Sequence, residues 1–599
     1  MRYIAVGIMA LVLAACSHSK ETTTDASKDQ TIAVTGSALG AIVDPSGRRG
    51  APSAALGLYS GAVGGLLAAA PPPPPPRRAG DIDTERYEDV DPNPVKQTAK
   101  QPVSTFAAEV DTASYANVRR YLTDGTAPPR DAVRPEELLN YFDYDYPLAS
   151  SADAPFRPSL ALVPSPWAKD KVLLHIGLRG YDVPRTERPP VNLTFLIDVS
   201  GSMQPENKLP LVKKALRLLV DQLTEKDSVA LVVYAGAAGE VLAPTSGADK
   251  AKILSAIENL SAGGSTAGGE GLALAYRLAE SRFDADALNR VMIATDGDFN
   301  VGVVDDERLE DFVAKKRETG IFLSVIGVGA GNYNDALMQT LAQNGNGTAN
   351  YLDTLNEAQK VFNKELAGAL FPIAKDVKIQ VEFNPAKVAE WRLIGYETRA
   401  LQEEDFKNDR VDAGEIGAGS SVTAIYELTP VGSSAVLIDP PRYGAPAPAS
   451  SAAVAEWAFV KIRYKKPKED ESRLIETPVL DGAAFARLEA ASDATRFATA
   501  VAGYAQLLRG DPYLDPDFGF DAVIALANGA KGADPYGLRA EFVQLARLAK
   551  NVQPLPEPQR PAAPEGQPPL QPGPRPIAPR PLPHGAPVPV PGNPAQQGG

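Results

Sequence analysis

The stretch VNLTFLIDVSGSM, Val191 to Met203, decides the fold because an apolar run in it ends abruptly at an acidic residue. Five of its first seven residues are Val, Leu, Phe or Ile, which predicts a buried strand. Asp198 stands at the carboxyl end of this strand, and ligands of open α/β sheets bind at that end. We therefore expect a sheet with helices on both faces and a site built around Asp198.

The spacing D-x-S-x-S places Asp198, Ser200 and Ser202 on one short loop. Gly201 lets the backbone fold tightly, so that three side-chain oxygens can converge. Hard divalent cations prefer such oxygens, and Mg²⁺ needs octahedral geometry at about 2.0–2.1 Å. The pentapeptide alone is equally compatible with an Asx turn that leads into a helix N-cap.

Two further segments decide between these interpretations. LSAGGSTAGGEGLALAY, residues 260–276, is a Gly-rich loop that opens into a helix and carries Thr266. RVMIATDGDFNVG, residues 290–302, is a second apolar strand, and it ends on Thr295 and Asp296. Together with the first motif they resemble the metal-ion-dependent adhesion site of von Willebrand factor type A (VWA) domains.

The resemblance implies a bound Mg²⁺, or another divalent cation such as Mn²⁺ or Ca²⁺. In that family the cation keeps one coordination position for an acidic group of a protein partner. The implied ligands are Asp198, Ser200, Ser202, Thr266 and Asp296. Three nearby polar residues, Ser265, Glu270 and Asp298, are interpreted as loop or outer-sphere groups.

Beyond Met203, amphipathic segments alternate with apolar strands such as VALVVYA and IFLSVIGVG. This βαβ alternation predicts an α/β fold of the Rossmann-like, doubly wound type, with a mainly parallel sheet. A helix over residues 356–369 is expected to close the domain. In the VWA family that last helix can shift when the cation gains an acidic ligand.

The first sixteen residues, MRYIAVGIMALVLAAC, carry one Arg and an apolar core too short to span a bilayer. The end of this segment resembles the bacterial lipobox, in which Cys16 becomes the lipidated first residue after cleavage. Cys16 is also the sole cysteine of the chain. The resemblance implies an envelope lipoprotein, and Ser17 favours the outer membrane, facing the periplasm. An ordinary cleaved signal peptide is the alternative.

Composition shifts predict the order of domains. With 54 Pro and 50 Gly in 599 residues, the chain is expected to have several domains and disordered ends. Strands before and after the central domain are expected to pair, so that it is inserted between two halves of a sandwich. The flanking folded blocks resemble domains of a bacterial VWA lipoprotein family. The predicted order is a lipoprotein signal peptide (1–15), a disordered tether (16–92), a small VWA-associated domain (93–150), β-strands (151–190), the VWA domain (191–372), a β-rich region (373–465), a helical domain of unknown function (466–551) and a Pro-rich disordered tail (552–599).

Three function classes remain open. A net charge of −14 argues against nucleic-acid binding, which needs a basic surface. The favoured hypothesis is a non-enzymatic module that binds a protein partner through its cation. A metal-dependent hydrolase is less favoured because the three histidines form no H-E-x-x-H motif and no phosphate-binding loop is present. The third hypothesis is an envelope scaffold in which the cation only rigidifies the loops.

Overall fold

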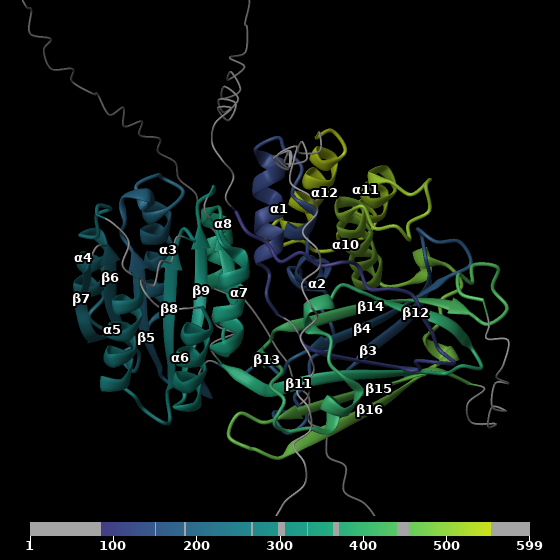
Figure 1. Cartoon of the computed structure of the whole chain (residues 1–599), viewed down its shortest axis with the longest axis horizontal. Helices are drawn as coiled ribbons and strands as arrows, with labels where there is room; N and C mark the ends of the chain where they lie inside the picture. The colour runs from purple at the N-terminus through teal and green to yellow at the C-terminus, as the bar shows by residue number, and fades with distance from the viewer. Residues whose placement is uncertain are drawn as a thin grey trace, which may run out of the picture. The chain divides into compact units, whose positions relative to one another are not determined.

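The structure is a computed structural model that describes residues 85–552 except 109, 150, 185–186, 236, 265–267, 298–305, 332, 363–370 and 440–454. The predicted signal peptide with Cys16, most of the predicted tether and nearly all of the Pro-rich tail lie outside the described residues. Figure 1 shows the arrangement of the remaining elements. No helix among the described residues combines the length and apolar character needed to cross a bilayer.

The central domain is built on a sheet of the order β10-β9-β8-β5-β6-β7. Neighbours within β10 to β6 run parallel, and β7 adds an antiparallel edge. The predicted doubly wound α/β fold is confirmed. The strands are β5 (Val191–Asp198), β6 (Ser228–Ala235), β7 (Ala237–Ser246), β8 (Leu288–Thr295), β9 (Ile321–Val328) and β10 (Ala349–Leu352).

Helices cover both faces of this sheet (Figure 1). Successive side chains of β5 point to opposite faces. Phe195 therefore joins a core that includes Val212, whereas Leu196 joins a second core that includes Leu272. The helices are α3 (Leu209–Gln222), α4 (Lys250–Glu258), α5 (Gly268–Ser281), α6 (Asp306–Glu318), α7 (Asp335–Asn344) and α8 (Leu355–Lys360).

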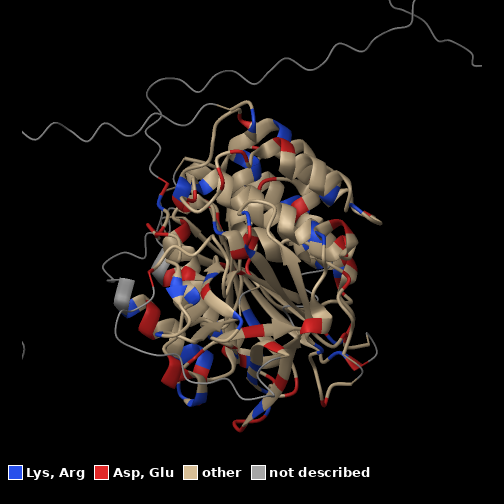
Figure 2. Cartoon of the chain, turned by 90° about the vertical axis from the view of Figure 1, so that its right-hand side faces the viewer, with Lys and Arg blue, Asp and Glu red and all other residues tan. Residues whose placement is uncertain are grey.

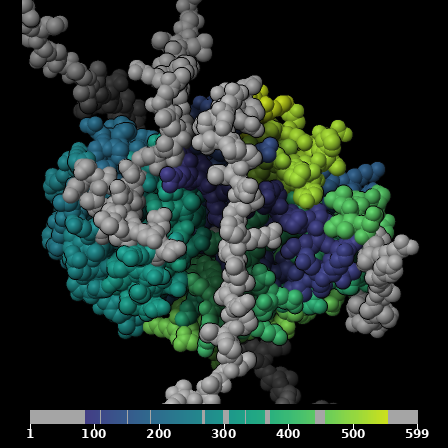
Figure 3. Space-filling model, viewed as in Figure 1, coloured from purple at the N-terminus to yellow at the C-terminus, as the bar shows by residue number. Residues whose placement is uncertain are grey.

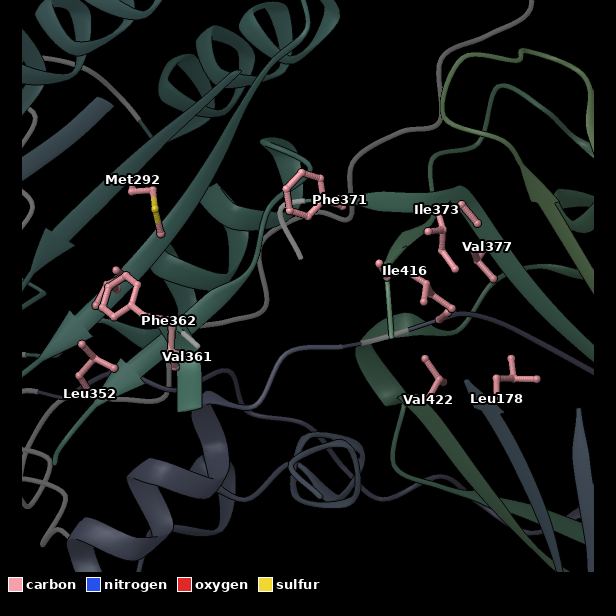
Figure 4. Packing of buried hydrophobic residues seen from close by; sticks show 14 of the residues in the cluster. Leu178, Met292, Leu352, Val361, Phe362, Phe371, Ile373, Val377, Ile416 and Val422 are labelled. Atoms are coloured by element: carbon pink, nitrogen blue, oxygen red, sulfur yellow. The ribbon is translucent and has the colours of Figure 1, made fainter. Parts of the chain in front are cut away.

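The segment after α8 remains packed on the domain. Figure 4 shows Val361 and Phe362 beside Met292 of β8 and Leu352 of β10. Residues 363–370, which include most of the rest of the predicted closing helix, lie outside the described part of the chain.

The strands on either side of the central domain form two sheets. One has the order β1-β12-β14-β4-β3, and the other has the order β13-β11-β15-β16 with β2 also paired to β11. The strands are β1 (Lys96–Gln97), β2 (Val103–Ala107), β3 (Ser159–Pro164), β4 (Val172–Arg179), β11 (Pro372–Phe383), β12 (Val388–Ile394), β13 (Gly414–Gly417), β14 (Ser421–Pro430), β15 (Glu456–Lys465) and β16 (Ser472–Leu480).

Strand β4 ends before the central domain begins, and β14 follows the domain in sequence. The two strands nevertheless pair antiparallel, with His175 opposite Ile425. The predicted insertion of the central domain between parts of a β-structure is therefore confirmed. Figure 2 shows acidic and basic residues interspersed over these elements.

Helices from both ends of the described chain share one aromatic core. Tyr141 and Phe142 follow α2, and the Phe142 ring lies 5.0 Å from Phe497 and 5.7 Å from Phe542, between ring centroids. Tyr141 and Tyr144 join this core, and the Tyr141 hydroxyl also donates to Glu357 of α8, in the central domain, at 2.8 Å. The helices are α1 (Ala113–Thr123), α2 (Pro135–Asn140), α10 (Asp493–Arg509), α11 (Phe520–Asn528) and α12 (Leu538–Ala549).

Residues 85–87, which we call the Glu85 strap, lie within the range expected for the tether but contact folded elements. The Glu85 carboxylate accepts hydrogen bonds from Arg120 at 2.6 Å and from the Tyr121 hydroxyl at 2.7 Å, both on α1. Its other oxygen accepts a bond from the backbone N–H of Gly331, at 2.8 Å. The strap therefore joins α1 to the loop after β9.

Candidate metal centre

Asp198 and Asp296 stand at the carboxyl ends of neighbouring strands. Strands β5 and β8 pair parallel, with Ile197 opposite Ala294, so the residues that follow them meet at one edge of the sheet. Both aspartates are 0% exposed. A pair of buried carboxylates at this edge creates a demand for positive charge, because burying charge without a partner is costly.

The Asp198 carboxylate is held in place by neutral donors. Its Oδ1 accepts a hydrogen bond from the Ser200 backbone N–H at 2.8 Å. Its Oδ2 accepts bonds from the Tyr234 hydroxyl at 3.1 Å and the Thr295 hydroxyl at 3.3 Å. Burial raises the pKa of Asp198, the Ser200 bonds oppose this rise, and the charge of Asp296 adds to it. The two carboxylates therefore lie close enough to interact electrostatically.

The serine hydroxyls converge beside this carboxylate. Ser200 Oγ lies 2.9 Å from Ser202 Oγ, with Ser200 buried and Ser202 exposed. This loop is tied to the Gly-rich loop, because the Gly201 N–H donates to the Gly264 carbonyl at 3.1 Å. Gly264 has φ +99°, a conformation that favours glycine. The predicted meeting of these two loops is therefore present.

Four other residues singled out from the sequence remain. Thr266, the predicted hydroxyl ligand of the Gly-rich loop, lies outside the described residues, as do Ser265 and Asp298. Glu270 is described and lies exposed in the first turn of α5.

Lys208 is a member of the site that the sequence analysis missed. It precedes α3, and its Nζ donates to Asp296 Oδ2 at 2.8 Å. Its side chain is 9% exposed. A lysine is seldom buried unless its charge is paired. A positive group thus stands beside a proposed metal ligand and offsets its negative charge.

The donor set fits a hard divalent cation. The described residues provide two carboxylates and two hydroxyls, and such oxygens suit Mg²⁺, Mn²⁺ or Ca²⁺ better than softer metals. In the ranges that the structure describes, no group of three or more His, Cys, Asp or Glu residues is arranged to hold a metal. The hydroxyl-rich site between β5 and β8 therefore differs from a His- or Cys-based centre.

His175, the one histidine in the described part of the chain, lies away from this edge. It belongs to β4, where its Nε2 is 3.2 Å from the Thr499 hydroxyl of α10. Burial lowers its pKa to about 3, so the ring is neutral at physiological pH. His175 is a buried structural group between the β-structure and the C-terminal helices.

Family comparisons agree with the fold. The family model of the von Willebrand factor type A domain matches residues 192–364. A von Willebrand factor model matches residues 81–175, and the model "Uncharacterized protein YfbK, C-terminal" matches residues 368–552. The chain is therefore a VWA-domain protein with additional N- and C-terminal domains.

Similarity to one relative over most of both chains identifies the family within this class of VWA-domain proteins. The chain is 47% identical over 479 residues to Uncharacterized protein YfbK of Escherichia coli (strain K12), which covers 78% of this chain and 82% of the relative. The chain belongs to the YfbK family. VWA domains are typically interaction modules and commonly bind a divalent cation, which indicates protein–protein interaction or metal-dependent binding.

Solved structures show similar domains. A von Willebrand factor type A protein from Catenulispora acidiphila is 15% identical, with a TM-score of 0.36, covering 65% of this chain and 89% of that chain. The conserved hypothetical protein BatB from Bacteroides thetaiotaomicron is 25% identical, with a TM-score of 0.26, covering 29% of this chain and 97% of that chain.

Proposed function

We propose that this chain is a lipid-anchored protein of the bacterial cell envelope whose VWA domain binds a divalent cation and, through it, a protein partner. The role is a non-enzymatic binding one. The observation that supports it is the pair of fully buried carboxylates, Asp198 and Asp296, at adjacent strand ends beside the Ser200 and Ser202 hydroxyls.

The physical reason for partner binding is incomplete ligation. Asp198, Ser200, Ser202 and Asp296 would hold the cation, together with Thr266. Two carboxylates and three hydroxyls would fill five of the six positions of an octahedral Mg²⁺, so a partner's Asp or Glu gains a bond at the remaining position. The bound cation would supply an electrophilic contact point for that acidic group.

The proposed location follows from the N-terminal sequence. Cys16 would carry the lipid, and the tether rich in Gly, Ala and Pro would give the folded part reach from the membrane. The residue after Cys16 favours the outer membrane, with the folded part in the periplasm.

The proposal is tested by replacing Asp198 with Ala. Mg²⁺ binding to the full chain is measured by titration calorimetry, and partner capture is measured by crosslinking in native envelopes with and without a chelator. Asp221→Ala, an exposed position on α3, is the matched control. We expect D198A and chelation to abolish both signals and D221A to keep them. Undiminished capture by folded D198A would exclude the mechanism.

A second function, an envelope scaffold whose cation only stabilises loops, is favoured by one observation. Arg119 of α1 binds Asp353 and Glu357, so the end of the VWA domain is fixed to neighbouring helices by buried ion pairs. The two functions give different results under chelation. A scaffold would lose thermal stability yet keep its crosslinks, whereas a cation-dependent binder would lose the crosslinks.

A further inference from the structure

The Lys208 side chain reaches the metal centre from outside the predicted ligand set. Its ammonium donates to Asp296 Oδ2 at 2.8 Å, and Asp296 is fully buried. The charge-bearing end of the residue therefore lies on one of the two carboxylates that would bind the cation. Lys208 and a metal ion compete for the same negative charge.

The absence of a side chain at Gly329 leaves space for the Lys208 side chain. At Gly329, in the loop after β9, an added Cβ would lie 2.2 Å from Lys208 Cε and 2.7 Å from Lys208 Cγ. Gly329 also has φ +79°, which favours glycine. Any larger residue at position 329 would collide with the lysine stem. The buried position of the Lys208 side chain therefore depends on Gly329, which lies far from it in sequence.

Charge balance shows what this placement does. In formal charges, the carboxylates of Asp198 and Asp296 contribute −2 and Lys208 contributes +1, so these three side chains sum to −1 without metal. A divalent cation changes the sum to +1 when Lys208 stays, and the same cation would give zero without the lysine. A partner carboxylate restores neutrality only when Lys208 is present.

We propose that Lys208 is a built-in competitor that weakens binding of the free cation and makes it depend on an acidic partner. The inference rests on the proposed function and adds its regulation. Without metal, the ammonium compensates the buried Asp296. When a cation arrives, its two charges repel the ammonium nearby, and a carboxylate from the partner offsets that repulsion. Cation and partner therefore favour each other's binding, as reciprocal linkage requires.

The test is calorimetric titration of MgCl₂ into the full chain and into Lys208→Met. We expect K208M to bind Mg²⁺ roughly tenfold more tightly or better, because a like charge a few ångströms away has been removed. The matched control is Lys214→Met, which removes the same charge from an exposed position on α3. K214M should leave the affinity unchanged.

Acetate serves as the probe carboxylate in a second titration. We expect acetate to tighten Mg²⁺ binding by the wild-type chain more than by K208M. An equal effect in both chains would overturn the proposed dependence on an acidic partner. Equal or weaker Mg²⁺ binding by folded K208M, without acetate, would overturn the competition itself.

Folding is controlled separately, because Asp296 loses its compensating charge in K208M. Lys208→Gln keeps an N–H donor without the charge and should bind Mg²⁺ more tightly as well. Thermal unfolding should show a lower midpoint for both variants without Mg²⁺, and a larger rise with Mg²⁺ than in the wild type. If neither the wild type nor either variant binds Mg²⁺, the proposed function fails together with this inference; if all bind equally, only the inference fails.

Discussion

Replacing Arg119 by Met tests what fixes the VWA domain to the rest of the chain. Arg119 lies on α1, and its guanidinium contacts both carboxylate oxygens of Asp353, at 2.5 and 2.7 Å. It also binds Glu357 of α8 at 2.6 Å and Glu541 of α12 at 2.9 Å. In Figure 3 the N-terminal segment in purple lies between the teal central domain and the yellow C-terminal helices. One side chain therefore joins three parts of the fold.

The size of the effect follows from burial. Asp353 is 9% and Glu357 only 2% exposed at the side chain. Removing one partner of a buried ion pair costs about 3–5 kcal/mol. Lys360 reduces this cost, because its Nζ lies 3.9 Å from a carboxylate oxygen of Glu357. We expect R119M to lose about 3 kcal/mol of unfolding free energy at pH 7.

Urea unfolding measures this loss. Circular dichroism follows the whole chain, whereas tryptophan fluorescence follows the fold outside the central domain, because Trp167, Trp391 and Trp457 all lie outside residues 191–372. Arg473→Met removes an exposed ion pair and should cost about 0.5 kcal/mol or less. A loss in R119M no larger than in R473M would refute the reasoning. Adding D353N and E357Q to R119M should recover much of the stability, since no buried carboxylate is then left unpaired.

Two other side chains give predictions of different kinds. Glu85→Gln removes the buried charged partner of Arg120 and should lower the free energy of unfolding, measured in urea, by about 2–4 kcal/mol. Glu88→Gln, in the same segment, is the control. Equal stability of the two variants would show that the Glu85 strap does not stabilise the fold. Burial and the neighbouring Glu397 raise the pKa of Glu136 to about 7. Between pH 4.5 and 7 this carboxyl binds more proton in the folded chain than in the unfolded chain, so its contribution to stability falls as pH rises through this window. Glu136→Gln imitates the protonated form and should remove that contribution, adding about 1–3 kcal/mol relative to the wild type at pH 8 and little at pH 4.5. A difference between the two chains that does not change with pH would contradict this.

Local sequence patterns were enough to predict the fold of the central domain and part of the metal centre. A buried strand in a parallel sheet reads as a continuous apolar run, and β5 and β8 are such runs. The resemblance to the VWA metal site placed Asp198 and Asp296 together, and the parallel pairing of β5 with β8 brings both to one edge of the sheet. The Gly-rich loop followed from its composition. These features depend on neighbours within a few residues, which a single sequence displays.

Long-range features escaped this kind of reasoning. Lys208 sits in an ordinary polar stretch, PENK, and it is buried only because Gly329 leaves room for its stem. The rings of Tyr141 and Phe142 pack with residues some 350 positions later, such as Phe497. Such contacts follow from the assembled fold and not from any local signal.

One loop connects the start of the folded chain with the metal centre. The Glu85 carboxylate accepts the Gly331 N–H, and two residues earlier Gly329 packs against the Lys208 stem. The Lys208 ammonium in turn holds Asp296. The strap and the lysine therefore contact the same loop, and the Glu85 and Lys208 variants probe two ends of one connected set of contacts.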